Sequence, residues 1–288
     1  MRWTLKTAPN LSLVDELSEV LSIDKVLSSL LIQRGVQTFD QAKKFFRPSL
    51  DDLHDPFLLK DMDIAVSRIE KAIANNENIL IYGDYDVDGT TAVSLVSSYL
   101  KTITNHIATY IPDRYDEGYG ISTQGIDFAA DHNFSLIIAL DCGIKAIDKV
   151  KYASQKNIDF IICDHHKPGD KLPKAVAVLN AKREDCSYPF DELCGCGVGF
   201  KLIQALASKR GQTLEDLTQY LDLVATAIAA DIVPITGENR ILTYFGLQVI
   251  NSNPRNGIKA IIQGVKKNIL TITDVVFIIA PRINAAGR

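Results

Sequence analysis

Acidic residues and histidines in this sequence stand directly after short apolar runs, a pattern that ordinary packing does not explain. Four runs end in this way: 79–83 before Asp84, Asp86 and Asp88; 136–140 before Asp141; 160–163 before Asp164, His165 and His166; and 223–230 before Asp231. Carboxylates gathered at one edge of a sheet repel and desolvate one another unless a cation neutralises them. Oxygen donors combined with histidine suit Mn²⁺ or Mg²⁺ better than a structural zinc ion. The pattern therefore predicts a metal-dependent hydrolase that acts on a phosphate ester.

The segment 84–89 has the pattern D-x-D-x-D-G, which also occurs in other kinds of site. An EF-hand loop requires a glutamate at its twelfth position, which is Leu95 here, and a P-loop requires a Gly-Lys-Ser/Thr sequence that this segment lacks. Residues 86–90 fit the D-x-D-G-T element of haloacid-dehalogenase-type phosphatases, in which Asp86 would be a covalent nucleophile. That phosphatase and a simple solvated turn remain alternatives for this segment taken alone.

The histidine pair is more informative because it follows a buried strand and an aspartate. Two adjacent histidines in a loop are usually exposed and without function, but here His165 is placed to ligate a metal while Asp164 orients its ring. His166 would then face the substrate phosphate. The glycines at 195, 197 and 199 precede a helix and form a turn that could offer backbone N–H groups to an anion, which is a weak signal by itself.

The elements that must position these residues alternate along the chain. Strands are predicted at 79–83, 107–111, 136–140, 159–163 and 175–179, and helices at 61–75, 90–102, 123–132, 144–156 and 197–210. Such alternation predicts an α/β fold with a parallel sheet flanked by helices, preceded by an N-terminal helical cap and followed by a helical C-terminal segment. In parallel sheets ligands bind beyond the carboxyl ends of the strands, where the acids and histidines fall.

Three regions are expected: a helical cap at 1–60, a catalytic domain at 61–235 and a helical segment at 236–288. The net charge of −4 argues against a generally basic nucleic-acid-binding surface but leaves room for a local basic groove. Five cysteines do not form a disulfide framework, and no function is assigned to Cys194 and Cys196. No run is long enough to span a membrane and no signal peptide is recognised, which predicts a cytoplasmic protein. The sequence stops within a motif-like stretch, which suggests a truncated chain.

Taken together, these motifs resemble those of the DHH phosphoesterase superfamily, and within it the exonucleases that digest single-stranded DNA from the 5′ end. The resemblance covers essentially the whole chain. It rests on the segments 81–90, 111–120 with Arg114, 140–143, 164–166, 197–202, 230–234 and 281–288. The segments around Arg114 and Arg282 are typical of these exonucleases rather than of the pyrophosphatases in the same superfamily.

The resemblance implies two divalent ions, Mn²⁺ or Mg²⁺, and a set of residues for each. Asp86 and Asp141, helped by Asp84, would hold one ion; Asp88, Asp141, His165 and Asp231 would hold the other. His166 and Asp164 would act in catalysis. Arg282 would contact a backbone phosphate and belong to the catalytic groups, and Arg114 and Arg288 would bind substrate, since the planar guanidinium matches phosphate oxygens.

The resemblance also implies a monomer that acts on single-stranded DNA in repair and recombination, beside a repair helicase or a single-strand-binding protein as partner. Members of this branch continue beyond Arg288 into a second catalytic subdomain and an oligonucleotide-binding fold. Two alternatives remain within the superfamily. One is an oligoribonuclease or cyclic-dinucleotide phosphodiesterase with a small substrate. The other is a scaffold without activity, which the retained ligand residues disfavour.

Overall fold

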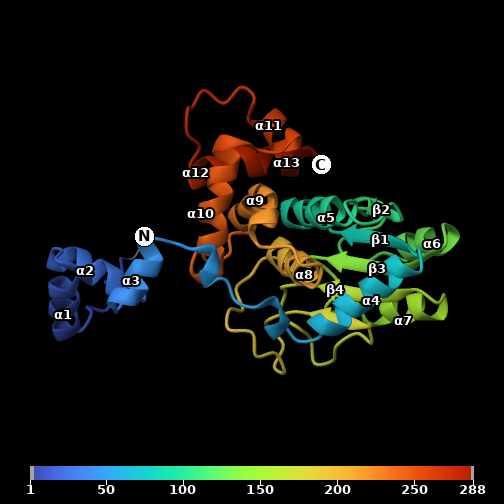
Figure 1. Cartoon of the computed structure of the whole chain (residues 1–288), viewed down its shortest axis with the longest axis horizontal. Helices are drawn as coiled ribbons and strands as arrows, with labels where there is room; N and C mark the ends of the chain where they lie inside the picture. Colours follow the sequence, from blue (N-terminus) through green and yellow to red (C-terminus); the bar gives the residue numbers. More distant parts are fainter. Residues whose placement is uncertain (1–2, 287–288) are drawn as a thin grey trace. The chain divides into compact units, whose positions relative to one another are not determined.

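A computed structural model of the chain describes residues 3–286 (Figure 1). The chain divides into two units, the first ending at Leu53 and the second beginning at His54. Within the described residues, no helix has both the length and the apolar character needed to cross a membrane.

The first unit is a small helical assembly. Its elements are α1 (Leu11–Leu21), α2 (Lys25–Ile32), α3 (Phe39–Phe46) and the 3₁₀ turn η1 (Leu50–Asp52). Asn10, Asp24 and Thr38 cap the three helices by accepting a backbone N–H in the first turn. A few buried side chains, among them Leu17 and Leu31, form its core.

The second unit is built around a parallel sheet of five strands. The strands are β1 (Asn78–Gly83), β2 (Ile107–Tyr110), β3 (Phe134–Leu140), β4 (Asp159–Cys163) and β5 (Ala177–Leu179). The helices are η2 (Pro56–Leu58), α4 (Met62–Ala74), α5 (Val87–Leu100), α6 (Thr123–Asp131), α7 (Ile147–Gln155), α8 (Gly195–Lys209), η3 (Glu215–Tyr220), α9 (Leu221–Asp231), α10 (Gly237–Ser252), α11 (Asn256–Ile262), α12 (Ile272–Asp274), η4 (Val275–Ile279) and α13 (Ala280–Ala286). The expected α/β class with a parallel sheet is confirmed.

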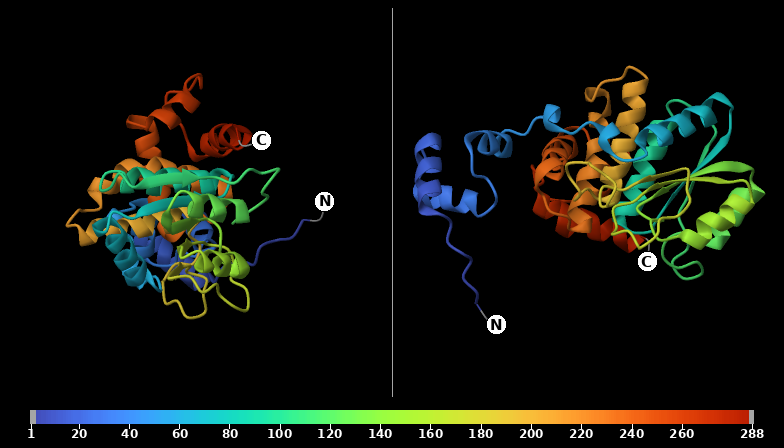
Figure 2. Two further views of the ribbon diagram at one scale, coloured as in Figure 1. Left: turned by 90° about the vertical axis from the view of Figure 1, so that its right-hand side faces the viewer. Right: turned by 90° about the horizontal axis from the view of Figure 1, so that it is seen from below.

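The strand order β2-β1-β3-β4-β5 contains a reversal between β1 and β3. From β1 the chain crosses to β2 on one side, and it then returns past β1 to form β3 on the other side. Right-handed crossovers therefore put α5 on one face of the sheet and α6 and α7 on the opposite face (Figure 1, Figure 2). The crevice at such a reversal is the usual ligand site of an open α/β sheet.

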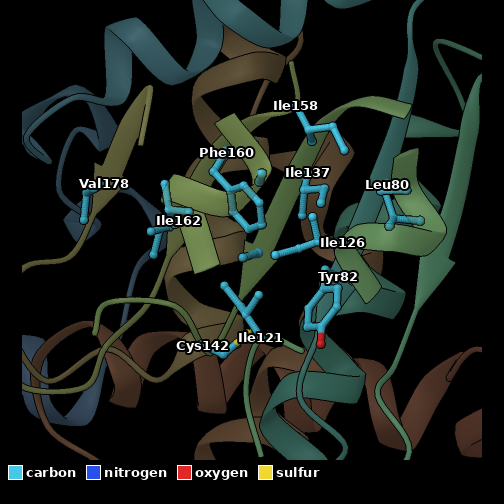
Figure 3. Packing of buried hydrophobic residues seen from close by; sticks show 14 of the residues in the cluster. Leu80, Tyr82, Ile121, Ile126, Ile137, Cys142, Ile158, Phe160, Ile162 and Val178 are labelled. Atoms are coloured by element: carbon cyan, nitrogen blue, oxygen red, sulfur yellow. The ribbon is translucent and has the colours of Figure 1, made fainter. Parts of the chain in front are cut away.

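Successive side chains of each strand point to opposite faces of the sheet, and helices pack against both faces. On one face Leu80, Tyr82, Ile137 and Phe160 pack with residues of α6 and α7, as Figure 3 shows. The intervening strand residues face α5 and α8, and these helices also contact α9. Because α5 is enclosed between the sheet and α9, it is buried on almost every side, including at Asp88.

A buried ion pair joins α8 to α10. The ammonium group of Lys201 lies 2.5 Å from a carboxylate oxygen of Glu238 and donates to the carbonyl of His54 at 3.0 Å. The hydroxyl of Tyr188 donates to the same carboxylate at 2.6 Å. With Lys201 fully buried and Glu238 nearly so, this network fixes the start of the second unit to its helical layer.

Among the boundaries that differ from the sequence-based expectation are three helix starts, two of which are explained by capping side chains. Helix α5 begins at Val87 rather than 90 because Asp86 caps it by accepting the N–H of Gly89. Helix α8 begins at Gly195 because the sulfur of Cys194 accepts the N–H of Gly197. Helix α7 begins at 147 rather than 144.

Candidate metal centre

The carboxyl ends of β1, β3 and β4 bring the predicted acids and histidines to one edge of the sheet. Asp84 follows β1, Asp141 follows β3, and Asp164 to His166 follow β4. These three strands are direct neighbours, with Gly83 beside Leu140 and Leu140 beside Cys163. The site therefore lies at the reversal of strand order.

Two further carboxylates come from the helical layer above this edge. Asp88 lies in the first turn of α5, and Asp231 is the last residue of α9 (Figure 1). Asp88 accepts the backbone N–H groups of Gly195 at 2.6 Å and Cys196 at 2.7 Å. The N–H groups of that glycine-rich turn, which the sequence suggested for an external anion, are therefore used by Asp88.

Asp141 occupies a strained and crowded position. Its φ of 60° lies in the left-handed region, which aspartate and asparagine tolerate better than most residues. Its backbone N–H donates to the carbonyl of Cys163 at 2.8 Å. A Cβ added to Gly195 would lie 2.5 Å from the Cβ of Asp141, so only glycine allows α8 to approach this closely.

Asp164 positions the second histidine of the pair rather than the first. One of its oxygens lies 2.8 Å from Nδ1 of His166 and also accepts that residue's backbone N–H at 3.0 Å. The other oxygen accepts the N–H of Ile144 at 2.9 Å, which holds that residue in the loop ahead of α7. The expected orientation of His165 by Asp164 is therefore wrong, and the ring that Asp164 fixes belongs to His166, whose side chain is 44% exposed.

His165 is the centre of the carboxylate cluster. Its Nε2 lies 3.3 Å from Asp141, 3.5 Å from Asp231 and 3.8 Å from Asp88. The ligand atoms form two groups, and within each group all atoms lie within 4.8 Å of one another. One group is Asp141, His165 and His166, and the other is Asp88, His165 and Asp231. His165 belongs to both groups, so the two could hold neighbouring ions.

Unsatisfied polar atoms show that a cation suits this cluster. Among the described residues, one oxygen each of Asp84, Asp141 and Asp231, together with Nε2 of His165, is buried without a hydrogen-bond partner. Buried polar groups in folded proteins almost always have partners, and here the missing partners converge on one place. Carboxylate oxygens and one or two imidazoles fit Mn²⁺ or Mg²⁺, so the residues present fit the expected cofactor.

The pKa values of the carboxylates support the same interpretation. Burial raises the pKa of Asp84 to about 6, with a contribution from the charge of Asp86. Burial and the charge of Asp231 raise the pKa of Asp88 to about 7, and burial raises the pKa of Asp231 to about 6. Burial, followed by the charge of Asp88, raises the pKa of Asp141 well above its usual value. Without a cation this cluster favours bound protons.

The histidines have opposite shifts. Burial and the neighbouring ring of His166 lower the pKa of His165 to about 4, so it is a neutral ligand at physiological pH. The hydrogen bond to Asp164 raises the pKa of His166. Burial opposes ionisation of Asp164, but hydrogen bonds from His166 and Ile144 leave its pKa below the usual value. His166 is therefore the imidazole of the pair that favours a positive charge.

Arg114 lies over the ring of Tyr85, the residue after Asp84, whereas Arg282 lines a different cavity. The Arg114 guanidinium carbon is 5.0 Å from the centroid of the Tyr85 ring. Arg282 donates to the carbonyl of Ile261 at 2.6 Å and lines a cavity that contains none of the carboxylates. Arg288 lies outside the described residues.

A cavity of about 320 Å³ opens beside the cluster. Asp86, Asp88 and Asp231 line one side of it, and α13 lines the other with Ala280 and Asn284. Asn284 was not identified from the sequence as a site residue. Tyr119 was missed too: burial together with the charge of Asp84 raises its pKa, which places its hydroxyl in the field of this carboxylate. The polar residues of the segments 111–120 and 281–288 were the available signal.

Comparison with known proteins agrees with this geometry. A sequence model described as "DHH family, N-terminal domain" matches residues 78–228. The chain is similar to the single-stranded-DNA-specific exonuclease RecJ of Bacillus subtilis, with 40% identity over all of this chain and 36% of that protein. It is also similar to RecJ of Escherichia coli, with 32% identity over 96% of this chain and 49% of that protein. The chain therefore spans less than half the length of these relatives.

Solved structures lead to the same group. A crystal structure of RecJ from Thermus thermophilus in complex with Mn²⁺ matches 99% of this chain and 40% of its own, with a TM-score of 0.82 and 27% identity. A manganese-bound exonuclease RecJ matches 83% of this chain and 59% of its own, with a TM-score of 0.74 and 30% identity. With its strand order, its acid and histidine cluster and a family match over more than half its length, the chain belongs to the DHH family.

Proposed function

We propose that this chain carries the metal centre of a 5′→3′ exonuclease that hydrolyses phosphodiester bonds of single-stranded DNA in repair and recombination. The observation that carries the proposal is that unpartnered oxygens of Asp141 and Asp231 lie 3.3 and 3.5 Å from the unpartnered Nε2 of His165. The names of its relatives, single-stranded-DNA-specific exonucleases, support the choice of substrate.

The ligand atoms divide between two ions, Mn²⁺ or Mg²⁺. Asp84, Asp86 and Asp141 would hold one ion, and Asp88, Asp141, His165 and Asp231 would hold the other. When bound, the ions supply a hydroxide nucleophile at neutral pH and positive charge against the phosphoryl oxygens. Asp88 keeps both of its N–H bonds to the α8 turn, so that turn fixes the carboxylate in place.

The half-exposed ring of His166 is the group of this chain that contacts the phosphate. Its bond to Asp164 favours the protonated imidazole, which donates a hydrogen bond to a phosphoryl oxygen as negative charge develops there. Asp164 acts through His166 and is a positioning residue. Arg114 binds the 5′ end beside Tyr85, and Arg282 and Arg288 contact backbone phosphates farther along the strand.

The rest of the assignment follows from the proposed activity. The residues 1–60 form a cap, 61–235 the catalytic domain, and 236–288 a helical segment that leads to further parts of a longer protein. The protein works in the cytoplasm as a monomer, together with a repair helicase or a single-strand-binding protein. Sequence-independent digestion requires contacts to phosphates and stacked bases rather than to base edges.

The test is digestion of a long, 3′-labelled single strand with Mn²⁺, beside two variants. Asp141→Asn removes a ligand charge while keeping a residue that tolerates a φ of 60°. Asp131→Asn is the matched control, because Asp131 is exposed at the end of α6 that leads into the opposite edge of the sheet. A 5′-labelled strand, a duplex and a dinucleotide complete the substrate set.

The expected result is stepwise shortening from the 5′ end by the wild type and Asp131→Asn, and none by Asp141→Asn. Cleavage of the dinucleotide with the long strand untouched would instead favour an oligoribonuclease-like enzyme with a small substrate. Equal activity of Asp141→Asn and wild type would refute the assignment of the metal centre.

A further inference from the structure

A second cavity lies beside α13, and of its lining residues only Arg282 has so far been given a function. It has a volume of about 580 Å³ and is lined by the loop around Lys266, by Phe277 of η4 and by Arg282 of α13. Pro281 and Ala285 line both this cavity and the one beside the carboxylates. The two cavities are therefore neighbours that share one wall.

The lining of this second cavity is cationic. Lys266, Lys267 and Arg282 line it, and no carboxylate does. Lys267 is paired with Asp274, but Lys266 forms no ion pair within residues 3–286. Arg282 donates to a neutral carbonyl, that of Ile261, so its positive charge is not compensated there. The cavity is complementary to an anionic chain.

An exposed aromatic ring, that of Phe277, lines the same cavity as these cations. Phe277 is 74% exposed, although Val275 and Ile279 on the same helical segment are fully buried. The segment is a π-helix, in which an extra residue in the turn changes the direction of its side chains, and such turns occur frequently at functional sites. Cations beside an exposed aromatic ring are the combination that proteins use to hold single-stranded nucleic acid, by phosphate contacts and base stacking.

We propose that this cavity is a second binding site for the single strand of DNA, an inference that rests on the proposed function. Phe277 is the stacking platform for a base, and Lys266 contacts a phosphate. The strand passes from the carboxylate cluster over the small side chains of Pro281 and Ala285.

The experiment measures the affinity of the 288-residue chain for a 12-nucleotide oligothymidylate, labelled at its 3′ end, by fluorescence anisotropy in EDTA. Phe277→Ala removes the ring, Phe277→Leu keeps an apolar side chain without an aromatic face, and Phe277→Trp keeps a stacking surface. Ile269→Ala is the control for loss of an exposed apolar side chain, since Ile269 is 72% exposed and does not line the cavity. Because Phe277 is exposed, its substitution leaves the fold intact.

Loss of one stacked base corresponds to about 1–3 kcal/mol, so Phe277→Ala and Phe277→Leu weaken binding by about 5- to 150-fold, whereas Phe277→Trp and Ile269→Ala stay within twofold of wild type. Lys266→Gln lowers the slope of log affinity against log salt by about 0.7, the value for one phosphate contact on a single strand. Lys101→Gln, at the opposite end of α5 from the metal centre, leaves that slope unchanged.

The outcomes separate this inference from the proposed function. Wild-type binding and 5′ shortening with Phe277→Ala inside twofold of wild type refute the second site alone. Wild-type affinity of Phe277→Leu also refutes the second site, because stacking needs an aromatic ring. The exposure of Phe277 would then be explained by an apolar surface that binds another protein segment. Failure of the wild type to bind or shorten the strand refutes the proposed function and this inference together.

Discussion

Binding of Mn²⁺ to the cluster should release about two more protons from Asp84, Asp88 and Asp231 at pH 6 than at pH 8. In the metal-free protein the pKa values of Asp84 and Asp231 are about 6 and that of Asp88 is about 7. At pH 6 the first two each hold half a proton and Asp88 holds nearly a whole one, about two in all, whereas at pH 8 the total is about 0.1. A cation takes the place of these protons.

The affinity of the cluster for Mn²⁺ should increase with pH. Protons compete with the cation, so the apparent affinity rises with pH through the range of the raised pKa values. The three pKa values together give an increase of about 40-fold between pH 6 and pH 8. Above pH 8 these three carboxylates contribute no further increase, because they are then ionised without the metal.

Isothermal titration calorimetry in two buffers with different ionisation enthalpies measures the released protons directly. The wild type and Asp131→Asn should show a larger difference between the buffers at pH 6 than at pH 8. Asp141→Asn should bind Mn²⁺ weakly at both pH values, because the ligand that lies 3.3 Å from His165 loses its charge. Identical heats in the two buffers at pH 6 would refute the reasoning, since the carboxylates would then be ionised before the metal arrives.

Three further predictions concern the stability of the protein and its binding of Mn²⁺. Asp141→Asn should raise the stability of the metal-free protein at pH 8 by about 1 kcal/mol or more, because it removes a buried charge whose pKa is raised and each pKa unit corresponds to about 1.4 kcal/mol; thermal unfolding in EDTA measures this. Gly195→Ala should cost about 1–3 kcal/mol and weaken Mn²⁺ binding, because the new Cβ would lie 2.5 Å from the Cβ of Asp141; Gly257→Ala, which meets nothing within 4 Å, is the control for urea unfolding and calorimetry. Lys201→Met should cost about 3–5 kcal/mol because it leaves Glu238 buried without its cation, and a double variant with Glu238→Gln should recover part of that loss in urea unfolding.

Each of these predictions has a result that contradicts it. A metal-free Asp141→Asn protein less stable than wild type at pH 8 would mean that the carboxylate is stabilised by other groups. Equal effects of Gly195→Ala and Gly257→Ala would mean that α8 is not in close contact with the site. A double variant as unstable as Lys201→Met alone would show that the loss comes from packing rather than from the unpaired charge of Glu238.

The strands and their order of appearance were predictable because each is a short apolar run followed by a turn. The runs at 79–83, 136–140 and 159–163 match β1, β3 and β4 closely. The acids and the two histidines could be placed at one edge because parallel strands share their carboxyl ends. Asp141 and Asp231 both lie close to Nε2 of His165, and their assignment as metal ligands stays a prediction.

Contacts between distant parts of the chain could not be predicted in the same way. Asp88 and Gly195 are 107 residues apart, and no local pattern reveals that this carboxylate accepts two N–H groups of the α8 turn. The choice of Asp164 between two adjacent rings depends on the path of the loop, which the sequence does not specify. The exposure of Phe277 depends on a π-helical turn, which apolar periodicity treats as ordinary helix.

The use of ligands from both the sheet and α9 has a consequence for the order of synthesis. Asp84 leaves the ribosome roughly 7–30 s before Asp231, at about 5–20 residues per second. At the start of that interval the nascent chain contains the acids that follow β1 but not yet His165, and Asp231 is the last of the proposed ligands to be made. High-affinity capture of the metal therefore has to wait until the ninth helix has been made and has packed against α5. With the proposed ligand sets, metal loading therefore follows the packing of α9 against α5.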